Sequence, residues 1–133
     1  MLDCSVTMAW LFDDEDDPHA AGVRDRLDAD VALVPSIWPL EVANALAAAE
    51  RRKRVSRAEG LRFLEVLRQV PIEVAAMPSL VSVEGAFQIA HETGLSLYAA
   101  SYLDLAATRG VPLATLDAAL GRAAGKIGVE TLR

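Results

Sequence analysis

Short apolar segments alternate with helical stretches along the whole chain of 133 residues. The apolar segments are brief and largely free of charge, which is typical of strands that are covered on both faces. Strands that alternate with helices favour a mostly parallel sheet between layers of helices. We therefore expect an α/β fold, a three-layer α/β/α domain with a central sheet of four to five short strands. The expected strands are Met1–Cys4, Val31–Val34, Ile72–Ala75, Pro112–Leu116 and Val129–Leu132.

The helices between these segments carry start and stop signals. Ser56, followed three residues later by Glu59, forms a capping-box pattern at the start of one helix. Two further helices have a serine at the expected start and a glycine at the expected end, namely Ser79 with Gly94 and Ser96 with Gly110.

The composition places these elements in one domain, residues 1–133. The apolar fraction of 53% excludes a disordered chain, and no apolar run approaches the roughly 20 residues of a membrane span. No basic segment precedes an apolar run at the N-terminus, and Cys4 is the single cysteine, so we expect a cytoplasmic protein without disulfides. The net charge of −6 excludes a global basic surface for nucleic acid, so nucleic-acid binding would have to be local or helped by a metal ion.

Three carboxylates fall at the exits of expected strands. Asp3 ends the first strand, Asp117 follows Pro112–Leu116, and Glu41 lies in the first turn of the helix after Val31–Val34. Sites in open α/β sheets form outside the carboxyl ends of the strands, so these side chains could converge on one rim. Clustered carboxylates repel one another unless a cation such as Mg²⁺ or Mn²⁺ lies between them. Such an ion activates water and stabilises charge on a phosphodiester, which is the chemistry of a metal-dependent nuclease.

Each acid also has a purely structural interpretation. Asp3 could cap a helix that starts near Ser5, and Asp117 could cap one that starts at Ala118. Glu41 could serve only to favour the helix dipole. The spacing of the acids alone leaves both interpretations open.

Four segments of the chain combine into one pattern. They are Leu2-Asp3-Cys4-Ser5-Val6, then Pro39-Leu40-Glu41-Val42-Ala43-Asn44-Ala45-Leu46, then Leu95-Ser96-Leu97-Tyr98 with Tyr102-Leu103 and Leu105-Ala106, and finally Pro112-Leu113-Ala114-Thr115-Leu116-Asp117. In this order and at these separations they resemble a PIN domain, and most closely the VapC-type toxins of bacterial toxin–antitoxin pairs. The resemblance spans essentially the whole chain.

The resemblance implies a PIN-like three-layer domain with Mg²⁺- or Mn²⁺-dependent endoribonuclease activity, often on a structured RNA such as a tRNA. It also implies a homodimer that a VapB-type antitoxin holds inactive. Of the family's acidic metal-binding and catalytic residues, the first maps to Asp3, the second to Glu41 and the last to Asp117.

Three polar residues are expected to support these acids. Ser5 matches a hydroxyl position beside the metal in the family pattern. Asn44 lies one helical turn after Glu41 on the same face and could orient it. Thr115 precedes the last acid and could form a hydrogen bond at the site.

The sequence departs from the family pattern at Ala99, where an aspartate is expected. Asp104 is a poor replacement, because five residues along a helix turn it about 140° away from the required face, and we expect it to face solvent. Two explanations remain open: a degenerate natural copy, or deliberate removal of the acid from a toxic nuclease. With either explanation, we expect the chain to bind metal poorly and to cleave slowly or not at all.

One dense basic cluster stands out, made of Arg51, Arg52, Lys53 and Arg54. It could contact RNA phosphates or an acidic stretch of a partner, and its alternative is a solvated helix end that suits the helix dipole. The acidic run 13–17 is expected to be a solvated loop. Apolar positions in excess of what one domain can bury suggest a partner surface.

Two functions from different classes therefore compete. The first is a metal-dependent endoribonuclease toxin. The second is a non-catalytic, degenerate PIN domain that binds antitoxin or RNA, with Ala99 as its signature. A phosphotransfer enzyme or receiver domain also places aspartates at strand ends, but it would require a second acid where this chain has Ser5, or an acidic pair and a lysine that the chain lacks at the matching positions.

Overall fold

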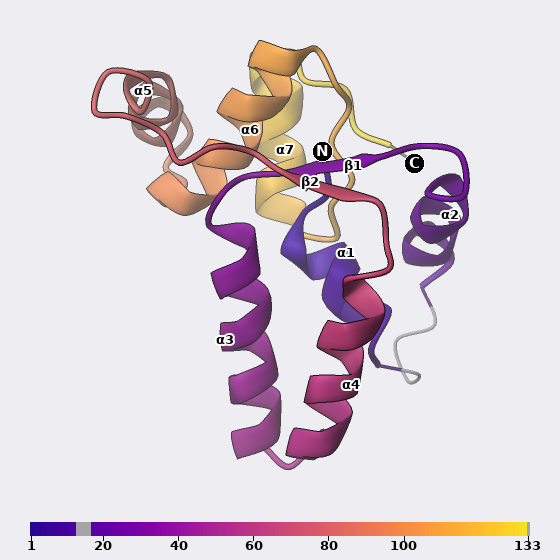
Figure 1. The fold of residues 1–133 in the computed structure, drawn as a ribbon. Coiled ribbons are helices and arrows are strands. Elements are labelled where there is room, and N and C mark those ends of the chain that lie inside the picture. The colour runs from indigo at the N-terminus through magenta and orange to yellow at the C-terminus, as the bar shows by residue number, and fades with distance from the viewer. Residues whose placement is uncertain (13–16, 133) are drawn as a thin grey trace.

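The computed structural model describes residues 1–12 and 17–132. These residues form seven helices and two strands, which Figure 1 traces from indigo at the N-terminus to yellow at the C-terminus. None of the helices in this part of the chain is long and apolar enough to cross a membrane. In chain order the elements are α1 (Cys4–Ala9), α2 (Pro18–Arg26), β1 (Ala32–Val34), α3 (Trp38–Arg51), α4 (Arg57–Leu67), β2 (Ile72–Val74), α5 (Glu84–Thr93), α6 (Leu97–Arg109) and α7 (Ala118–Ile127).

The sheet is parallel, as the alternation of segments predicts. β1 pairs with β2 in parallel, with Ala32 opposite Ile72 and Val34 opposite Val74. The three other expected strands take part only through single bridges and hydrogen bonds, all of them parallel in sense where they pair. The Leu2 amide donates to the Leu33 carbonyl at 2.9 Å, and bridges join Leu2 to Ala114 and Leu113 to Thr131.

The predicted number of strands is therefore not reached in the described residues, which contain two. The segments have little room to extend, because helices start immediately after them. α1 begins at Cys4, so the first segment has three residues before it, and α7 begins at Ala118, directly after the Asp117 cap. The bridges still bring the ends of these segments to the same side of the molecule, since parallel segments end at a common edge.

The helices bury the bridging segments and β1 on both sides. In Figure 1, β1 and β2 cross the middle of the molecule, with α3 and α4 below them and α6 and α7 above. The core contains Leu2 and Leu113 from the bridging segments, Val34 from β1 and Leu103 from α6, all of them fully buried or nearly so. Packing of these apolar side chains holds together segments that lie far apart in the sequence.

Most of the predicted helix boundaries are confirmed. Ser56 and Glu59 form the expected capping box at the start of α4. Ser96 caps α6 by accepting from the Ala99 amide at 3.2 Å. Gly94 and Gly110 end α5 and α6 in the left-handed conformation, with φ of 72° and 62°, which only glycine adopts without a steric penalty.

The predicted cap of α5 is wrong. α5 begins at Glu84 and has Val83 at its N-cap, whereas Ser79 accepts from the Ser82 amide at 3.1 Å in a turn before the helix. The serine finds a local amide in that turn, and such a local hydrogen bond competes with helix formation.

The acidic run 13–17 lies outside the described residues except for its last member. Asp17 is the N-cap of α2, where its carboxylate accepts from the amides of His19 at 2.8 Å and Ala20 at 3.1 Å. Asp17 is therefore half-buried at a helix start, and the expectation of a solvated loop does not hold for this residue.

We expect the removal of the Ser56 hydroxyl and that of Ser79 to lower stability by different amounts. We expect Ser56→Ala to lower the free energy of unfolding by about 1 kcal/mol, because it removes the acceptor of the Glu59 amide at the start of α4. Ser79→Ala is the matched control and should lose less, since it caps no helix. Urea denaturation followed by circular dichroism measures both, and equal losses would contradict the assignment.

Candidate active site

Asp3 is a buried carboxylate at the point where the first bridging segment ends and α1 begins. Its residue is 8% exposed, and its amide donates to the Ala114 carbonyl at 3.0 Å. It occupies the N-cap position of α1, but its side chain makes no capping hydrogen bond. Instead, its Oδ2 accepts from the hydroxyl of Ser5 and, at 2.7 Å, from that of Thr115.

The two hydroxyls tie Asp3 to the exit of the 113–115 segment. Ser5 Oγ accepts from the Leu116 amide at 2.9 Å, and Thr115 Oγ1 accepts from the Asp117 amide at 3.0 Å. Each hydroxyl thus donates to the carboxylate while it accepts from the backbone, an arrangement in which successive hydrogen bonds polarise one another. The result is a carboxylate with a fixed orientation.

Glu41 lies on the first turn of α3 and meets Tyr102 from α6. The Tyr102 hydroxyl donates to Glu41 Oε2 at 2.5 Å, within the range of a charge-assisted hydrogen bond. Burial raises the pKa of Glu41, the nearby Asp3 carboxylate raises it further, and the hydrogen bond from Tyr102 opposes both effects. Asp3 and Glu41 are therefore close enough to repel each other.

Cys4 lies beside both acids and stays a thiol. Burial raises its pKa to about 12, and the carboxylates of Glu41 and Asp3 add to this effect. Only the thiolate form of cysteine acts as a nucleophile or as a metal ligand, so Cys4 is unsuited to either role at neutral pH.

Asp117 has the structural role that the sequence left open. Its carboxylate accepts from the amides of Ala119 at 2.7 Å and Leu120 at 3.1 Å, which caps α7. It is joined to Asp3 indirectly, because its own amide donates to Thr115. Asp3 and Asp117 are equivalent as candidate caps in the sequence, and the structure separates them.

The donor set fits a hard divalent cation held by few protein ligands. Within residues 1–12 and 17–132, no three His, Cys, Asp or Glu side chains form a ready group for a metal. Asp3 and Glu41 provide two mutually repelling carboxylates whose oxygens suit Mg²⁺ or Mn²⁺. Mg²⁺ is commonly held by one or two carboxylates together with waters and substrate phosphates, so carboxylates such as these suit it.

Position 99 lies on the first turn of α6, three residues before Tyr102. The Ala99 amide donates to Ser96, and the residue is half-buried against the core. It precedes Tyr102 by three residues, so both lie on one face of α6, and Tyr102 contacts Glu41. An acid at position 99 would therefore join the face of α6 that is turned toward Glu41.

Asp104 does not replace the missing acid, and the expectation that it faces solvent is wrong. It is half-buried, and its carboxylate lies so close to Gly85 of α5 that a Cβ at position 85 would collide with it. Burial raises the pKa of Asp104. It belongs to the packing of α5 on α6.

Tyr102 is the site residue that sequence reasoning missed. Its residue is 1% exposed, and the hydroxyl of a buried tyrosine requires a partner. This requirement, together with its position one turn after Ala99, was the available signal. The predicted helper Asn44 is exposed on α3, whereas the hydrogen bond that fixes Glu41 comes from Tyr102.

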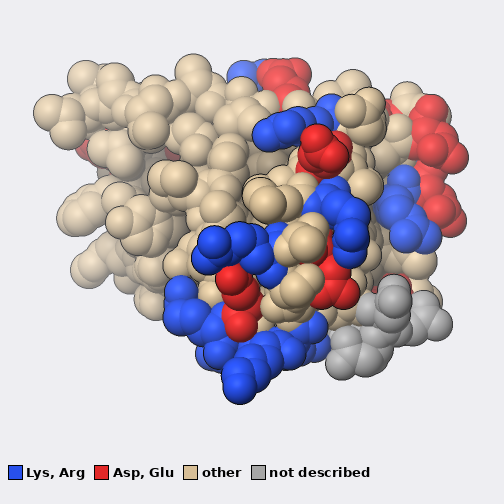
Figure 2. Space-filling model, turned by 60° about the horizontal axis from the view of Figure 1, so that its bottom comes forward, with Lys and Arg blue, Asp and Glu red and all other residues tan. Residues whose placement is uncertain are grey.

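The basic cluster lies at the other end of α3 from Glu41. Arg51 ends α3, Arg52 is its C-cap, and Lys53 and Arg54 belong to the turn that leads to α4. Figure 2 views the end of the molecule where this turn comes forward and shows Lys and Arg side chains gathered there, with a few acidic ones among them. The basic cluster therefore lies apart from Glu41.

The chain is similar to known proteins over most of its length. The chain matches the PIN domain family over residues 1–126. It is 35% identical over 123 residues to Ribonuclease VapC3 of Mycobacterium tuberculosis, in strains CDC 1551 / Oshkosh and ATCC 25618 / H37Rv, and the match covers 92% of this chain and 85% of the relative. The fold is similar to that of PAE2754 from Pyrobaculum aerophilum, with a TM-score of 0.70 and 24% identity over 92% of this chain and 82% of the other.

The parallel sheet, together with these matches, defines the class: the chain belongs to the PIN-domain family. The resemblance seen in the four segments is thereby confirmed. Within the family the protein is of the VapC type, since it matches Ribonuclease VapC3 over nearly its whole length. Ribonucleases of this family generally depend on a divalent metal, which agrees with the oxygen donors of Asp3 and Glu41.

Tyr102→Phe tests the contact that fixes Glu41. We expect it to lower the free energy of unfolding by about 1 kcal/mol, less than for a fully buried charged pair, because Glu41 remains partly exposed to water. Tyr98→Phe on the same helix is the matched control, because Tyr98 is exposed and its loss should be within error. Chemical denaturation of both variants checks this, and equal values would show that the hydroxyl of Tyr102 contributes nothing.

Proposed function

We propose that this protein is a metal-dependent endoribonuclease toxin of a type II toxin–antitoxin pair, and that it cleaves a structured RNA such as a tRNA. The observation that carries the proposal is the buried Asp3 carboxylate, fixed by the hydroxyls of Ser5 and Thr115 and electrostatically coupled to Glu41. A buried charge is costly unless its surroundings compensate it, so such a pair of acids calls for a functional explanation. The similarity to proteins named Ribonuclease VapC3 supports the same activity.

Each residue of the site has a distinct task in this proposal. Asp3 and Glu41 hold Mg²⁺ or Mn²⁺, and Asp117 adds a third acid at the rim. When bound, the ion activates water and stabilises charge on the phosphodiester. Ser5 and Thr115 keep the Asp3 carboxylate oriented, and Tyr102 does the same for Glu41.

Ala99 leaves this chain catalytically impaired. A side chain at position 99 lies on the same face of α6 as Tyr102, so an aspartate there would add a negative charge beside Glu41. Metal affinity depends on the number and charge of the ligands, so the alanine weakens metal binding. This same residue favours a second candidate function, a non-catalytic PIN domain that binds antitoxin or RNA.

The partners follow from the chemistry of the site. A VapB-type antitoxin would neutralise the acids by inserting a basic side chain, since arginine pairs with carboxylates through two parallel hydrogen bonds. Both this complex and the RNA substrate belong to a cytoplasmic setting.

A homodimer accounts for the apolar surface around α5. Large apolar side chains are exposed on α5, on the segment before it and at the start of α6: Met77, Leu80, Val81, Phe87, Leu97 and Tyr98. Leu80 is 94% exposed and Phe87 is 67% exposed. Monomeric proteins rarely leave such a patch in water, so a second copy of the chain is the proposed occupant.

The activity is tested by restoring the missing acid. We expect Ala99→Asp to raise Mg²⁺- or Mn²⁺-dependent cleavage of RNA by on the order of 10- to 100-fold and to make the protein toxic to growing cells. Adding Asp3→Asn to this variant should abolish both effects, because it removes a ligand charge. The measurement is cleavage of total RNA, with metal or with EDTA, at equal protein concentration.

The remaining outcomes separate the two candidate functions. If the unaltered chain already cleaves as fast as the Ala99→Asp variant, cleavage needs no acid at position 99 beside Asp3, Glu41 and Asp117, and the proposed mechanism is wrong. If Ala99→Asp binds metal but still does not cleave, the non-catalytic binding domain is favoured.

The dimer is tested at its apolar surface. We expect the unaltered chain to be a dimer at micromolar concentration, and Leu80→Glu with Phe87→Glu to make it a monomer, because two charges would be buried without partners. Leu61→Glu with Val66→Glu is the matched control on α4, where both side chains are also exposed. Multi-angle light scattering reports the mass, and a monomeric unaltered chain would contradict the proposal.

A further inference from the structure

The chain concentrates its positive charge in one place. Of its 13 basic residues, five lie between positions 50 and 59, together with only two of its 19 acidic residues. The remainder of the chain is strongly acidic. Because like charges repel, gathering them in one turn is unfavourable for stability, so the turn between α3 and α4 invites a functional explanation.

The backbone of this turn supplies a second observation. Four described residues have positive φ: Gly94, Gly110 and Gly128, which follow α5, α6 and α7, and Lys53, with φ of 57°, which follows α3. This left-handed conformation is unfavourable for any residue with a Cβ, which is why glycine is the usual choice. Three of these four left-handed positions are therefore glycine. The one that follows α3 is a lysine, in spite of the steric cost.

The cations of the turn differ in what they already contact. The Arg54 guanidinium lies 3.9 Å from the centre of the Phe12 ring, and Arg57 Nε lies 3.3 Å from Glu50 Oε1. Arg51, Arg52 and Lys53 are exposed at the end of the α3–α4 hairpin. These three are exposed cations that take part in neither of those two contacts.

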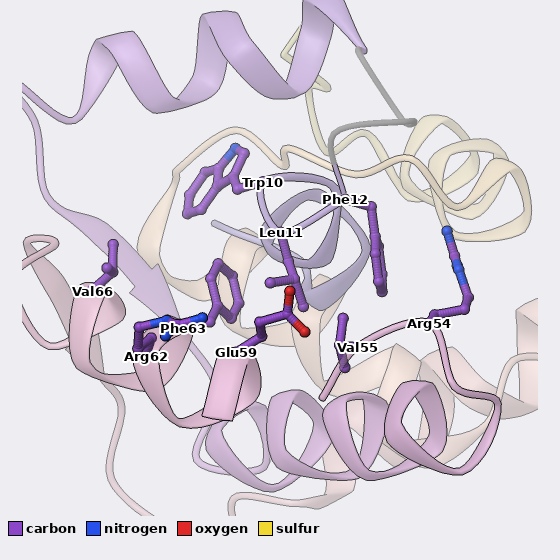
Figure 3. Close-up of a pocket in the computed structure, with 9 residues that line it drawn as sticks. All are labelled: Trp10, Leu11, Phe12, Arg54, Val55, Glu59, Arg62, Phe63 and Val66. Atoms are coloured by element: carbon purple, nitrogen blue, oxygen red, sulfur yellow. The ribbon is translucent and has the colours of Figure 1, made fainter. Parts of the chain in front are cut away.

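The surroundings of the tip favour a phosphate backbone over a protein. None of the large exposed apolar side chains in the described residues falls between positions 50 and 59. Protein interfaces are centred on buried aromatic and apolar anchors, whereas binding to nucleic acid can rest on exposed cations alone. A pocket of about 620 Å³ lies between α4 and the residues that follow α1, and Figure 3 shows it. Arg54 lines that pocket, while Arg51, Arg52 and Lys53 do not.

The tip is rigidly connected to the acids. Glu41 lies on the first turn of α3 and Arg51 on its last, so the helix separates them by about 15 Å along its axis. About five or six base pairs of an RNA duplex cover this distance, since the rise per base pair of A-form RNA is somewhat less than the roughly 3.4 Å of B-form DNA. One structured RNA can therefore reach both ends of α3.

We propose that Arg51, Arg52 and Lys53 form a docking site for the phosphate backbone of a structured RNA, away from the acids that cleave it. The inference rests on the proposed ribonuclease function and adds to it a fixed second contact. Because α3 is rigid, this contact sets which part of the RNA lies at Asp3 and Glu41. It selects substrates by the shape of their backbone, as expected for the recognition of double-stranded RNA.

Binding without cleavage is the direct test. The probe is a fluorescently labelled tRNA transcript, and its anisotropy is measured in EDTA between 50 and 200 mM KCl (about the range over which several phosphate contacts change affinity by orders of magnitude). We expect Arg52→Gln with Lys53→Gly to weaken binding and to reduce the slope of log K against log salt by about one for each lost contact. Lys53→Gly alone should reduce the slope by about one, and its melting temperature should be unchanged or higher, because glycine relieves the left-handed backbone.

Arg109→Gln with Lys126→Gln is the matched control. It removes two exposed cations from the last turns of α6 and α7, and so the same net charge. We expect its salt slope to equal that of the unaltered chain. An equal loss in this control, or an unchanged slope for Arg52→Gln with Lys53→Gly, would overturn the proposal.

The cleavage assay separates this proposal from the proposed function. In the Ala99→Asp background, Arg52→Gln with Lys53→Gly should raise KM for the tRNA about tenfold and leave kcat unchanged. An unchanged KM in an active nuclease overturns the docking site alone. An inactive Ala99→Asp variant whose RNA binding still depends on Lys53 overturns the nuclease and supports the docking site.

Discussion

The hydrogen bonding of the buried Asp3 carboxylate is the interaction on which the rest of the site depends. A charge removed from water is costly unless hydrogen bonds replace its hydration. Asp3 obtains them from Ser5, two residues away, and from Thr115, which lies 112 residues away in the sequence. The same two hydroxyls accept from the amides of Leu116 and Asp117, so the start of the chain and the 115–117 segment are fixed together.

The neighbouring acids acquire different properties from different surroundings. The hydrogen bond from Tyr102 lowers the pKa of Glu41. Burial and the charge of Asp3 raise it by more, so the pKa of Glu41 lies above its ordinary value. Asp117 instead satisfies the amides of α7. Asp3 therefore caps no helix, Glu41 is electrostatically coupled to Asp3, and Asp117 caps α7. Ala99 lies on α6 three residues before Tyr102, the residue that contacts Glu41.

α3 connects the two charged features of the molecule. Its first turn carries Glu41, and its last turn carries Arg51 at the start of the basic tip. The acidic site and the basic tip therefore lie at opposite ends of one helix. The strained backbone at Lys53 is consistent with this separation, because glycine serves the same geometry elsewhere in the chain without a charge.

Contacts within a few residues were determined by the sequence alone, since their partners are fixed by spacing. The capping box of Ser56 and Glu59 and the helix ends at Gly94 and Gly110 belong to this group. The alternation of segments likewise predicted parallel pairing, and the four family segments predicted the PIN domain. The reduction of three expected strands to single bridges and the start of α5 were not predicted, because each depends on which local hydrogen bond outcompetes another.

Only the tertiary structure decided how the polar side chains are used. Asp3 and Asp117 are interchangeable as helix caps in the sequence, yet only Asp117 caps, because Thr115 and Ser5 engage Asp3 across the fold. The partner of Glu41 lies 61 residues away on α6, whereas its local candidate Asn44 is exposed. The physical reason is that a side chain bonds whichever partner the packed core brings within about 3 Å, and the sequence encodes that proximity only through the whole fold.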